Sequence, residues 1–167
     1  MNIKEAINTN IFLPYENDIM SSIRAMDDKR LNKQILETKQ ILDVALGKSD
    51  GYSNHPVTKW YINHPKFLIA YGYGCCAEYE CRFGKNHKYY SYYKAQYDKI
   101  GYNEMIEWAP YYAEGRKSDT NHIRTTDNVS ELFKNKLCDK WDVDVKNGRP
   151  PKWTNCDPPR FWKGAKE

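Results

Sequence analysis

The order of apolar and polar residues along the chain predicts helices rather than strands. From Phe67 to Tyr79 apolar side chains recur at helical spacing, and Pro65 can occupy the first turn of a helix, where its missing N–H costs nothing. Gly72 and Gly74 leave room for a neighbouring helix to pack closely. We expect this helix to form the centre of the core through Phe67, Leu68, Tyr71, Cys75 and Tyr79.

The N-terminal part of the chain predicts an extended stretch and a short helix. Residues 11–15, IFLPY, are apolar and include Pro14, so they should pack against the core in an extended conformation. In the next stretch, ENDIMSSIRAM, Asn17 or Asp18 can act as the N-cap of a short helix. Residues 1–10 are polar and weakly patterned, and we expect them to form an N-terminal extension.

A long helix follows, and its residues fall into two stripes. Asp27 or Asp28 can cap its N-terminus, and Gly47 can end it. At about 100° per residue, one stripe is typical of a core face; it contains Leu31, Ile35, Thr38, Leu42 and Ala45. The other stripe contains Arg30, Lys33, Gln34 and Glu37. This second stripe is either an ordinary solvated surface or one wall of a site for an anion.

Two segments in the middle of the chain also favour helices. Pro56 can stand in the first turn of a helix that Asn54 or His55 caps. The basic and aromatic stretch 85–97, KNHKYYSYYKAQY, is moderately helical. Its tyrosines and lysines could contact a single nucleic-acid strand, but they are equally typical of an ordinary amphipathic helix.

The C-terminal part predicts one more helix and then an irregular tail. Thr126 or Asp127 can cap this helix. Its inward residues should be Val129, Leu132, Phe133 and Leu137, and its other face presents Lys134, Lys136 and Lys140. The stretch 147–162 contains four prolines and three aromatic residues, so it should lie over the body as an irregular strap.

These elements together indicate an all-α fold. The sequence contains no alternating strand pattern of any length and no internal repeat. At 167 residues, one domain with a sizeable core is expected. We predict a compact single-domain helical bundle over residues 11–167, with an irregular Pro/Trp-rich C-terminal tail.

The amino-acid composition limits the kinds of ligand that the protein is expected to bind, but it does not identify one. Lys and Arg number 26 against 22 Asp and Glu, a formal charge of +4, which permits a DNA or nucleotide ligand without requiring it. The 14 Tyr and 5 Trp can fill a core or stack on bases, and for any single Tyr packing is the stronger interpretation. The five cysteines and four histidines follow no metal-binding spacing, so we expect no metal and no cofactor.

The chain also lacks a recognisable signal peptide and any long apolar run. We therefore expect a cytoplasmic protein with reduced thiols and no membrane partner. Cys75 and Cys76 should be small buried apolar residues rather than a redox pair. The frequent use of Lys, Asn, Ile and Tyr is typical of an AT-rich genome such as that of a phage.

Four segments of the sequence have to be considered together, because their order along the chain is informative. They are NIFLPY, MDDKRLNKQILE, GYSNHPVTKWY and FLIAYGYGCCAEYECRFG. In this order they resemble a bacterial and phage family related to the pyrimidine-dimer DNA glycosylases of the phage endonuclease V type. The resemblance runs from about Ile11 to Gly84 and is thinner over 120–162. The pattern Arg-Leu-x-Lys-Gln-x-x-Glu is its most specific part.

The resemblance implies a compact helical enzyme that binds kinked DNA and accommodates a flipped base. In that family the N-terminal α-amine attacks the sugar C1′ beside a helix carboxylate, and the carboxylate corresponds to Glu37 here. Glu37 would stabilise the positive charge that grows on the sugar as its base leaves. Arg30, Lys33 and Gln34 would bind phosphate and position the sugar. Because about ten residues precede Ile11, we do not predict AP-lyase (strand-cleaving) activity, whereas a reaction with water stays open.

Each candidate residue also has a simpler explanation. Glu37 and Lys33 could be a surface ion pair at i,i+4 spacing. Tyr15 could stack on a ligand beside Glu37, although packing in the core is slightly favoured. Lys134 and Lys136 could contact a nucleic-acid backbone, but a solvated helix face is the stronger interpretation.

The segment around His55 is similarly ambiguous. Asn54, His55 and Lys59 could bind phosphate at a helix N-terminus, where N–H groups point outward, or could simply form a cap. The leading hypothesis is a DNA glycosylase-type enzyme that acts on an N-glycosidic bond in DNA or in a nucleotide. The alternative is a non-catalytic protein that holds a nucleotide or nucleic acid in the same basic pocket.

Overall fold

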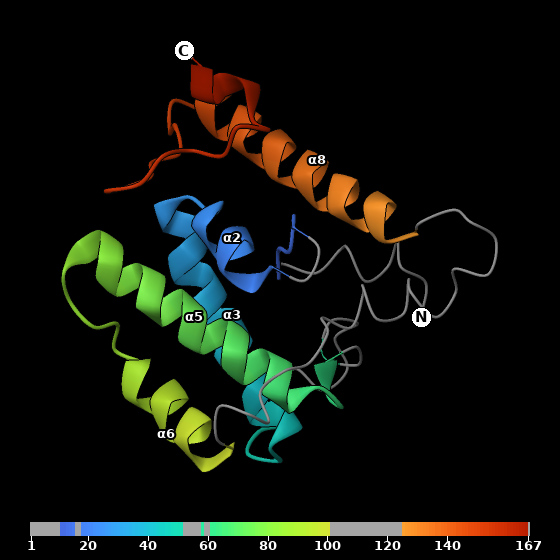
Figure 1. Ribbon diagram of the computed structural model, residues 1–167, viewed down its shortest axis with the longest axis vertical. Coiled ribbons are helices and arrows are strands. Elements are labelled where there is room, and N and C mark those ends of the chain that lie inside the picture. The colour runs from blue at the N-terminus through green and yellow to red at the C-terminus, as the bar shows by residue number, and fades with distance from the viewer. Residues whose placement is uncertain (1–10, 16–17, 52–57, 59–60, 101–124, 167) are drawn as a thin grey trace.

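The computed structural model describes residues 11–15, 18–51, 58, 61–100 and 125–166, and the side chains from 129 onward in the last range. The principal elements are α2 (Ile19–Arg24), α3 (Asp28–Ala45), α5 (Pro65–Phe83), α6 (Tyr90–Ile100), α8 (Thr125–Lys146) and the 3₁₀ helix η2 (Lys163–Lys166) (Figure 1). No strand occurs among the residues that the structure describes. The predicted all-α helical fold is therefore confirmed.

The helix ends follow the predicted signals. The Asp18 carboxylate accepts a hydrogen bond from the Ser21 backbone N–H at 3.0 Å and so caps α2. Asp27 is the N-cap residue of α3, which ends before Gly47 at a φ of 74°. Pro65 opens α5 as predicted. The expected cap at Asn54 or His55 lies outside the described residues.

Helix α5 is the centre of the core, as its pattern predicts. It contacts α2, α3 and α6, and Figure 1 shows it lying among them. A Cβ atom on Gly72 would lie 2.0 Å from the ring of Tyr93, so the absence of a side chain lets α6 approach α5. The residues Phe67, Leu68, Tyr71, Cys75 and Cys76 are fully buried, and Tyr79 is partly buried.

The basic and aromatic stretch of α6 packs against the body of the protein. The Tyr93 hydroxyl is buried and donates to the Ile35 carbonyl of α3. The Tyr92 hydroxyl donates to the Asp43 carboxylate. Tyr73 of α5 stacks on Tyr97 with ring centroids 4.6 Å apart. These tyrosines therefore fill and close the core, in agreement with the packing interpretation.

The structure of helix α8 differs from the prediction in two details. It begins at Thr125, so Thr126 and Asp127 lie inside the helix rather than at its cap. Leu132 was expected to face inward, but it is 38% exposed. The buried stripe repeats every four residues, and Leu132 is turned away from it by about 100°. That stripe consists of Val129, Phe133, Leu137 and Trp141.

The tail after α8 is the irregular strap that its prolines predict, and its tryptophans anchor it. Trp153 and Trp162 pack against Trp141, with ring centroids 5.1 and 5.5 Å away. The indole N–H of Trp153 donates to the Ala25 carbonyl at 3.1 Å. That of Trp162 donates to Asp142 at 2.9 Å. Because each buried indole N–H has an acceptor, the aromatic cluster carries no unpaired donor there.

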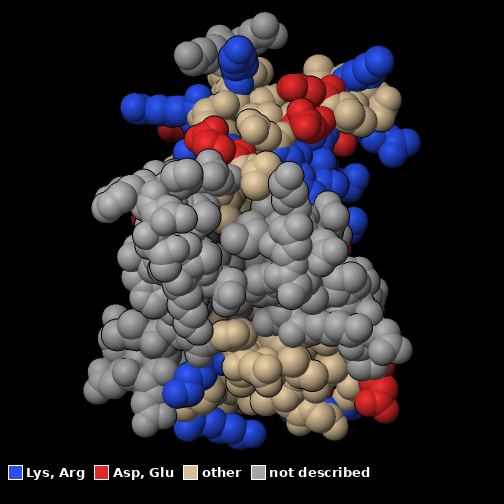
Figure 2. Space-filling model, turned by 90° about the vertical axis from the view of Figure 1, so that its right-hand side faces the viewer, with Lys and Arg blue, Asp and Glu red and all other residues tan. Residues whose placement is uncertain are grey.

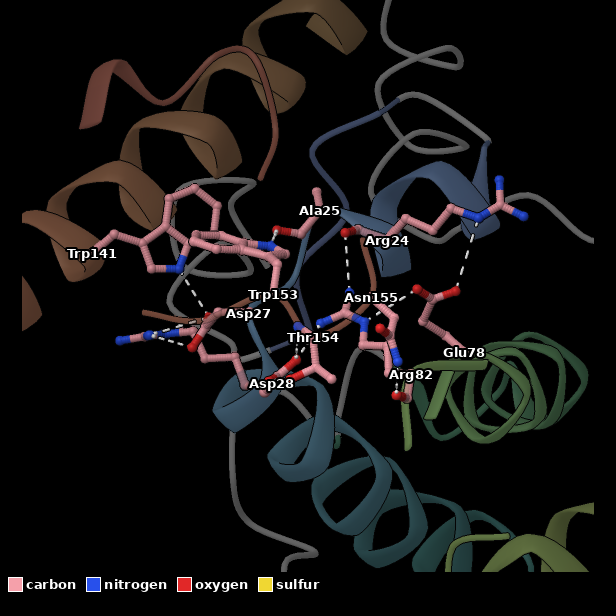
Figure 3. Close-up of polar contacts among 11 residues, drawn as sticks. Arg24, Ala25, Asp27, Asp28, Glu78, Arg82, Trp141, Trp153, Thr154 and Asn155 are labelled. Carbon is pink, nitrogen blue, oxygen red and sulfur yellow. Dashed lines mark hydrogen bonds and ion pairs between the residues drawn. The ribbon is translucent and has the colours of Figure 1, made fainter. Parts of the chain in front are cut away.

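Two adjacent carboxylates connect the start of α3 to other helices and to the C-terminal tail (Figure 3). Asp27 is 1% exposed and accepts from the indole N–H of Trp141 at 2.8 Å and from Arg30 at 3.2 Å. Asp28 accepts from the Thr154 backbone N–H and from Arg82, each at 3.0 Å. The start of α3 is thereby bonded to α5, α8 and the tail.

Replacing Asp27 by Asn should lower the free energy of unfolding by about 3 kcal/mol, because the half-buried Arg30 would lose a charged partner. Urea titration followed by tryptophan fluorescence measures this change. Asp98→Asn removes an exposed carboxylate from an ion pair on α6 and should leave stability unchanged within error. Equal effects of the two substitutions would show that Asp27 does not hold the parts together.

Replacing Gly72 by Ala should lower the free energy of unfolding by about 1–3 kcal/mol, since the added methyl group would overlap the ring of Tyr93. Gly51 offers a matched control, because a Cβ there would meet only the Ser49 side chain at 3.4 Å. Thermal unfolding of the two variants measures the difference. A stable Gly72→Ala protein would mean that α6 can shift away from α5 at little cost.

Candidate functional site

The second stripe of α3 forms one wall of a small pocket of about 100 Å³. The pocket is lined by Phe12, Lys29, Arg30, Lys33, Gln34, Glu37 and Lys140. The four residues that the sequence places on one stripe of α3 are therefore brought together, and Glu37 supplies the carboxylate among the lining residues. Lys140 comes from α8, so the pocket lies where α3 and α8 meet.

Lys140, which lines the pocket from α8, belongs to a polar stripe on that helix. Lys136, Lys140 and Asp144 follow one another at intervals of four residues, which places them on one face of the helix; we call them the polar seam. Asp144 accepts from Arg30 at 2.8 Å, and Lys136 lies within electrostatic reach of Glu37. An early residue of α3, Arg30, thus meets a late residue of α8, Asp144.

Arg30 lines the pocket, but its guanidinium braces the two helices. Its Nη1 atom lies 3.2 Å from Asp27 and 2.8 Å from Asp144, and its side chain is 13% exposed. The phosphate-binding role predicted for Arg30 therefore has to compete with two carboxylates. Its structural role is to link the start of α3 to α8.

Gln34 is also part of the scaffold. It is 1% exposed, and its side-chain oxygen accepts from the Phe12 backbone N–H at 3.2 Å and from the Tyr71 hydroxyl at 2.8 Å. The same hydroxyl lies 3.1 Å from the Phe12 carbonyl oxygen. Gln34 thus ties the extended segment 11–15 to α3 and places the Phe12 ring at the pocket.

Lys136 departs from the expectation of a solvated helix face. The side chain is half-buried, and its Nζ atom lies 5.5 Å from the centroid of the Phe12 ring. Burial, together with repulsion from Lys140, lowers the pKa of Lys136 to about 8, although Glu37 acts in the opposite direction. The expectation is wrong because the apolar segment at Phe12 covers this side of α8.

Tyr15 and Lys134 lie elsewhere. The Tyr15 ring packs edge-on against Phe161 at 6.1 Å, and the Lys134 Nζ atom lies 5.4 Å from the Tyr15 ring. Tyr15 lines a separate depression together with Ser21, Arg24, Ala25, Asp157 and Pro159. It does not line the pocket that contains Glu37. Asn54, His55 and Lys59 lie outside the described residues, and their predicted roles stay predictions.

Sequence reasoning missed the pocket roles of Phe12 and Lys140 and the burial of Lys136. Phe12 was expected only to pack in the core, and it does so while its ring also lines the pocket. Lys136 and Lys140 are four residues apart, and this spacing was the available signal. Nothing local to α8 reveals which of its faces meets α3.

The described residues contain no group of three or more His, Cys, Asp or Glu side chains that could hold a metal ion. Within the same residues, no helix has the length and apolar character needed to span a membrane. Figure 2 shows charged side chains on the α8 layer and basic ones directly beneath it. In the pocket itself three lysines, Lys29, Lys33 and Lys140, surround Glu37. This arrangement suits an anionic ligand next to a single acid group.

Comparison with known protein families gives a match to part of the chain. Residues 10–91 match the sequence model of a family described as pyrimidine dimer DNA glycosylase. The matched segment contains the extended stretch at Phe12, the whole of α3 and the whole of α5. No curated protein and no solved structure matched the chain. The resemblance seen in the sequence is thus confirmed over residues 10–91, the part of the chain that is similar to the pyrimidine dimer DNA glycosylase family.

Proposed function

We propose that the protein is a DNA glycosylase that cleaves an N-glycosidic bond in DNA, with Glu37 as its catalytic carboxylate. The observation that carries the proposal is the position of Glu37 in a pocket with lysines from two helices. The relation of residues 10–91 to a DNA glycosylase family supports DNA as the substrate. At about 100 Å³, the pocket is smaller than the roughly 300 Å³ at which small-molecule sites begin. It suits a sugar-phosphate unit of a larger ligand better than a whole free nucleotide.

The chemistry needs a carboxylate beside the sugar. As the bond between C1′ and the base lengthens, positive charge develops on C1′ and the ring oxygen, and the Glu37 carboxylate stabilises it. The base leaves with the bonding electrons and takes up a proton. Glu37 can then transfer protons to or from the group that attacks C1′.

The lysines would hold the DNA backbone. Lys29 and Lys33 are exposed on α3, whereas Lys140 approaches from α8. Exposed ammonium groups of this kind neutralise phosphates without reading sequence. Arg30 and Gln34 would contribute indirectly, since the first braces α8 and the second holds Phe12.

Glu37→Gln should reduce the release of bases from ultraviolet-irradiated duplex DNA by about a hundredfold or more, because the amide cannot stabilise the developing charge or transfer protons in the same way. Formation of abasic sites, scored by alkaline cleavage, measures the reaction. Glu80→Gln, on the exposed surface of α5, is the matched control and should leave it unchanged. Full activity in the Glu37 variant would overturn the assignment. DNA binding by both proteins without any base release would instead favour the non-catalytic alternative.

Lys33→Gln should weaken DNA binding and reduce by about one the number of counterions released, since a phosphate contact would be lost. The slope of log Kd against log salt concentration, from fluorescence anisotropy with a labelled duplex, measures this number. Lys99→Gln removes an exposed lysine from α6, at the opposite end of the molecule from α8 (Figure 1). Equal slopes for both variants would show that DNA does not lie over the pocket.

A further inference from the structure

We propose that a second pocket, between the start of α3 and the C-terminal tail, binds the phosphodiester backbone of the DNA whose sugar lies at Glu37. This inference rests on the proposed function and adds to it a contact from the part of the chain beyond residue 91, where the family match ends. The second pocket has a volume of about 400 Å³, within the range of about 300–1,000 Å³ that is usual for ligand pockets. We call it the tail pocket, and it is lined by Asp27, Asp28, Lys29, Asp144, Gly148, Arg149, Pro150, Pro151 and Lys152.

The tail pocket adjoins the pocket that contains Glu37. Lys29 lines both of them. Arg30 lines the first and Asp144 lines the second, and the Nη1 atom of Arg30 lies 2.8 Å from the Asp144 carboxylate. The two pockets therefore meet at this ion pair. Because phosphates follow one another at about 3.4 Å of helix axis on each strand, a DNA backbone bound beside Glu37 can continue into the tail pocket.

The carboxylates of the tail pocket are already paired within the protein. Asp27 and Asp144 share the guanidinium group of Arg30, at 3.2 and 2.8 Å. Asp28 forms an ion pair with Arg82 at 3.0 Å. Two guanidinium groups therefore offset most of the negative charge of the three carboxylates.

Three basic side chains of the tail pocket are turned to solvent instead. Lys29, Arg149 and Lys152 are exposed, and no carboxylate in the described part of the chain forms an ion pair with any of them. Together with Arg30 and Arg82, they outnumber the three carboxylates, so the surroundings of the pocket are net positive. Exposed basic groups of this kind neutralise phosphates and release the counterions of DNA. Arginine can also bind two oxygens of one phosphate through its planar fork.

The segment that carries Arg149 and Lys152 is held at both ends. The Arg149 backbone N–H donates to the Asp144 carbonyl at 2.9 Å, and the Lys152 carbonyl accepts from the Asp28 backbone N–H at 2.8 Å. The two residues between them are prolines, whose rings fix φ near about −65°. A segment restrained in this way loses little conformational freedom when it binds, which favours a ligand site. The proline rings also offer an apolar surface to a deoxyribose.

Chemical footprinting of the wild-type protein tests the proposal. Lysines are acetylated with and without an excess of ultraviolet-irradiated duplex DNA at low salt, and peptide mass spectrometry gives the rate at each lysine. DNA should slow the acetylation of Lys152 by about fivefold or more, because a phosphate would cover its ammonium group. Lys163, an exposed lysine of the same tail that does not line the tail pocket, is the control and should react at an unchanged rate.

Arg149→Gln combined with Lys152→Gln should weaken DNA binding by about tenfold and reduce the slope of log Kd against log salt concentration by about two, since two phosphate contacts would be lost. Fluorescence anisotropy with a labelled duplex measures both quantities. Arg160→Gln removes another exposed arginine of the tail, one that does not line the tail pocket, and should leave the slope unchanged. Both replaced side chains are exposed, so the double variant should fold, and thermal unfolding checks this.

The outcomes separate this inference from the function on which it rests. Protection of Lys33 or Lys140 without Lys152, or equal slopes for the double variant and Arg160→Gln, would overturn the inference and leave the proposed glycosylase standing. Protection of Lys152 in a protein that releases no base would support the DNA contact and reject the catalytic role of Glu37. Inorganic triphosphate is added in place of DNA as a second arm. Protection of Lys152 by triphosphate but not by DNA would assign the pocket to a free phosphate ligand and overturn the inference, as would protection by neither.

Discussion

The carboxylates of Asp27 and Asp28 determine how the C-terminal part of the protein lies on the N-terminal part. Both stand at the start of α3, yet their donors come from three other places in the chain. A carboxylate as buried as that of Asp27 is tolerated only when its oxygens are paired, so the indole of Trp141 has to reach it. This requirement sets the position of α8 along α3. It thereby also sets where the polar seam meets Glu37.

The string that carries the family resemblance, DDKRLNKQILE, therefore serves two purposes on one helix. Asp27, Asp28 and Arg30 bond to other parts of the chain, and Gln34 holds the segment at Phe12. The remaining polar residues that line the pocket are Lys29, Lys33 and Glu37. A protein that kept this fold without its chemistry would still need the first group. Catalysis by the proposed site would therefore depend on the second group and on Lys140, which lines the pocket from α8.

The sequence could predict what depends on local periodicity. The α3 stripe follows from 100° per residue, and the pocket contains all four of its predicted members. The face that α8 turns toward α3 depends instead on contacts between distant residues, such as the one between Trp141 and Asp27. This is why Lys136 was expected in solvent and why the exposure of Leu132 was missed. For the same reason Tyr15, placed near Glu37 by its sequence neighbours, packs on Phe161 from the tail.

The surroundings of Lys136 are maintained by residues whose hydrogen bonds belong to the scaffold. Its amine rests on the Phe12 ring because Phe12 is bonded to Gln34 and Tyr71, both of which are buried against α3 and α5. If that support loosened, water would reach the amine and the pKa of Lys136 would move back toward its ordinary value. Burial of the lysine works against folding below its unfolded pKa, since the ammonium form is better solvated in the unfolded chain. The packing at Phe12 offsets that cost.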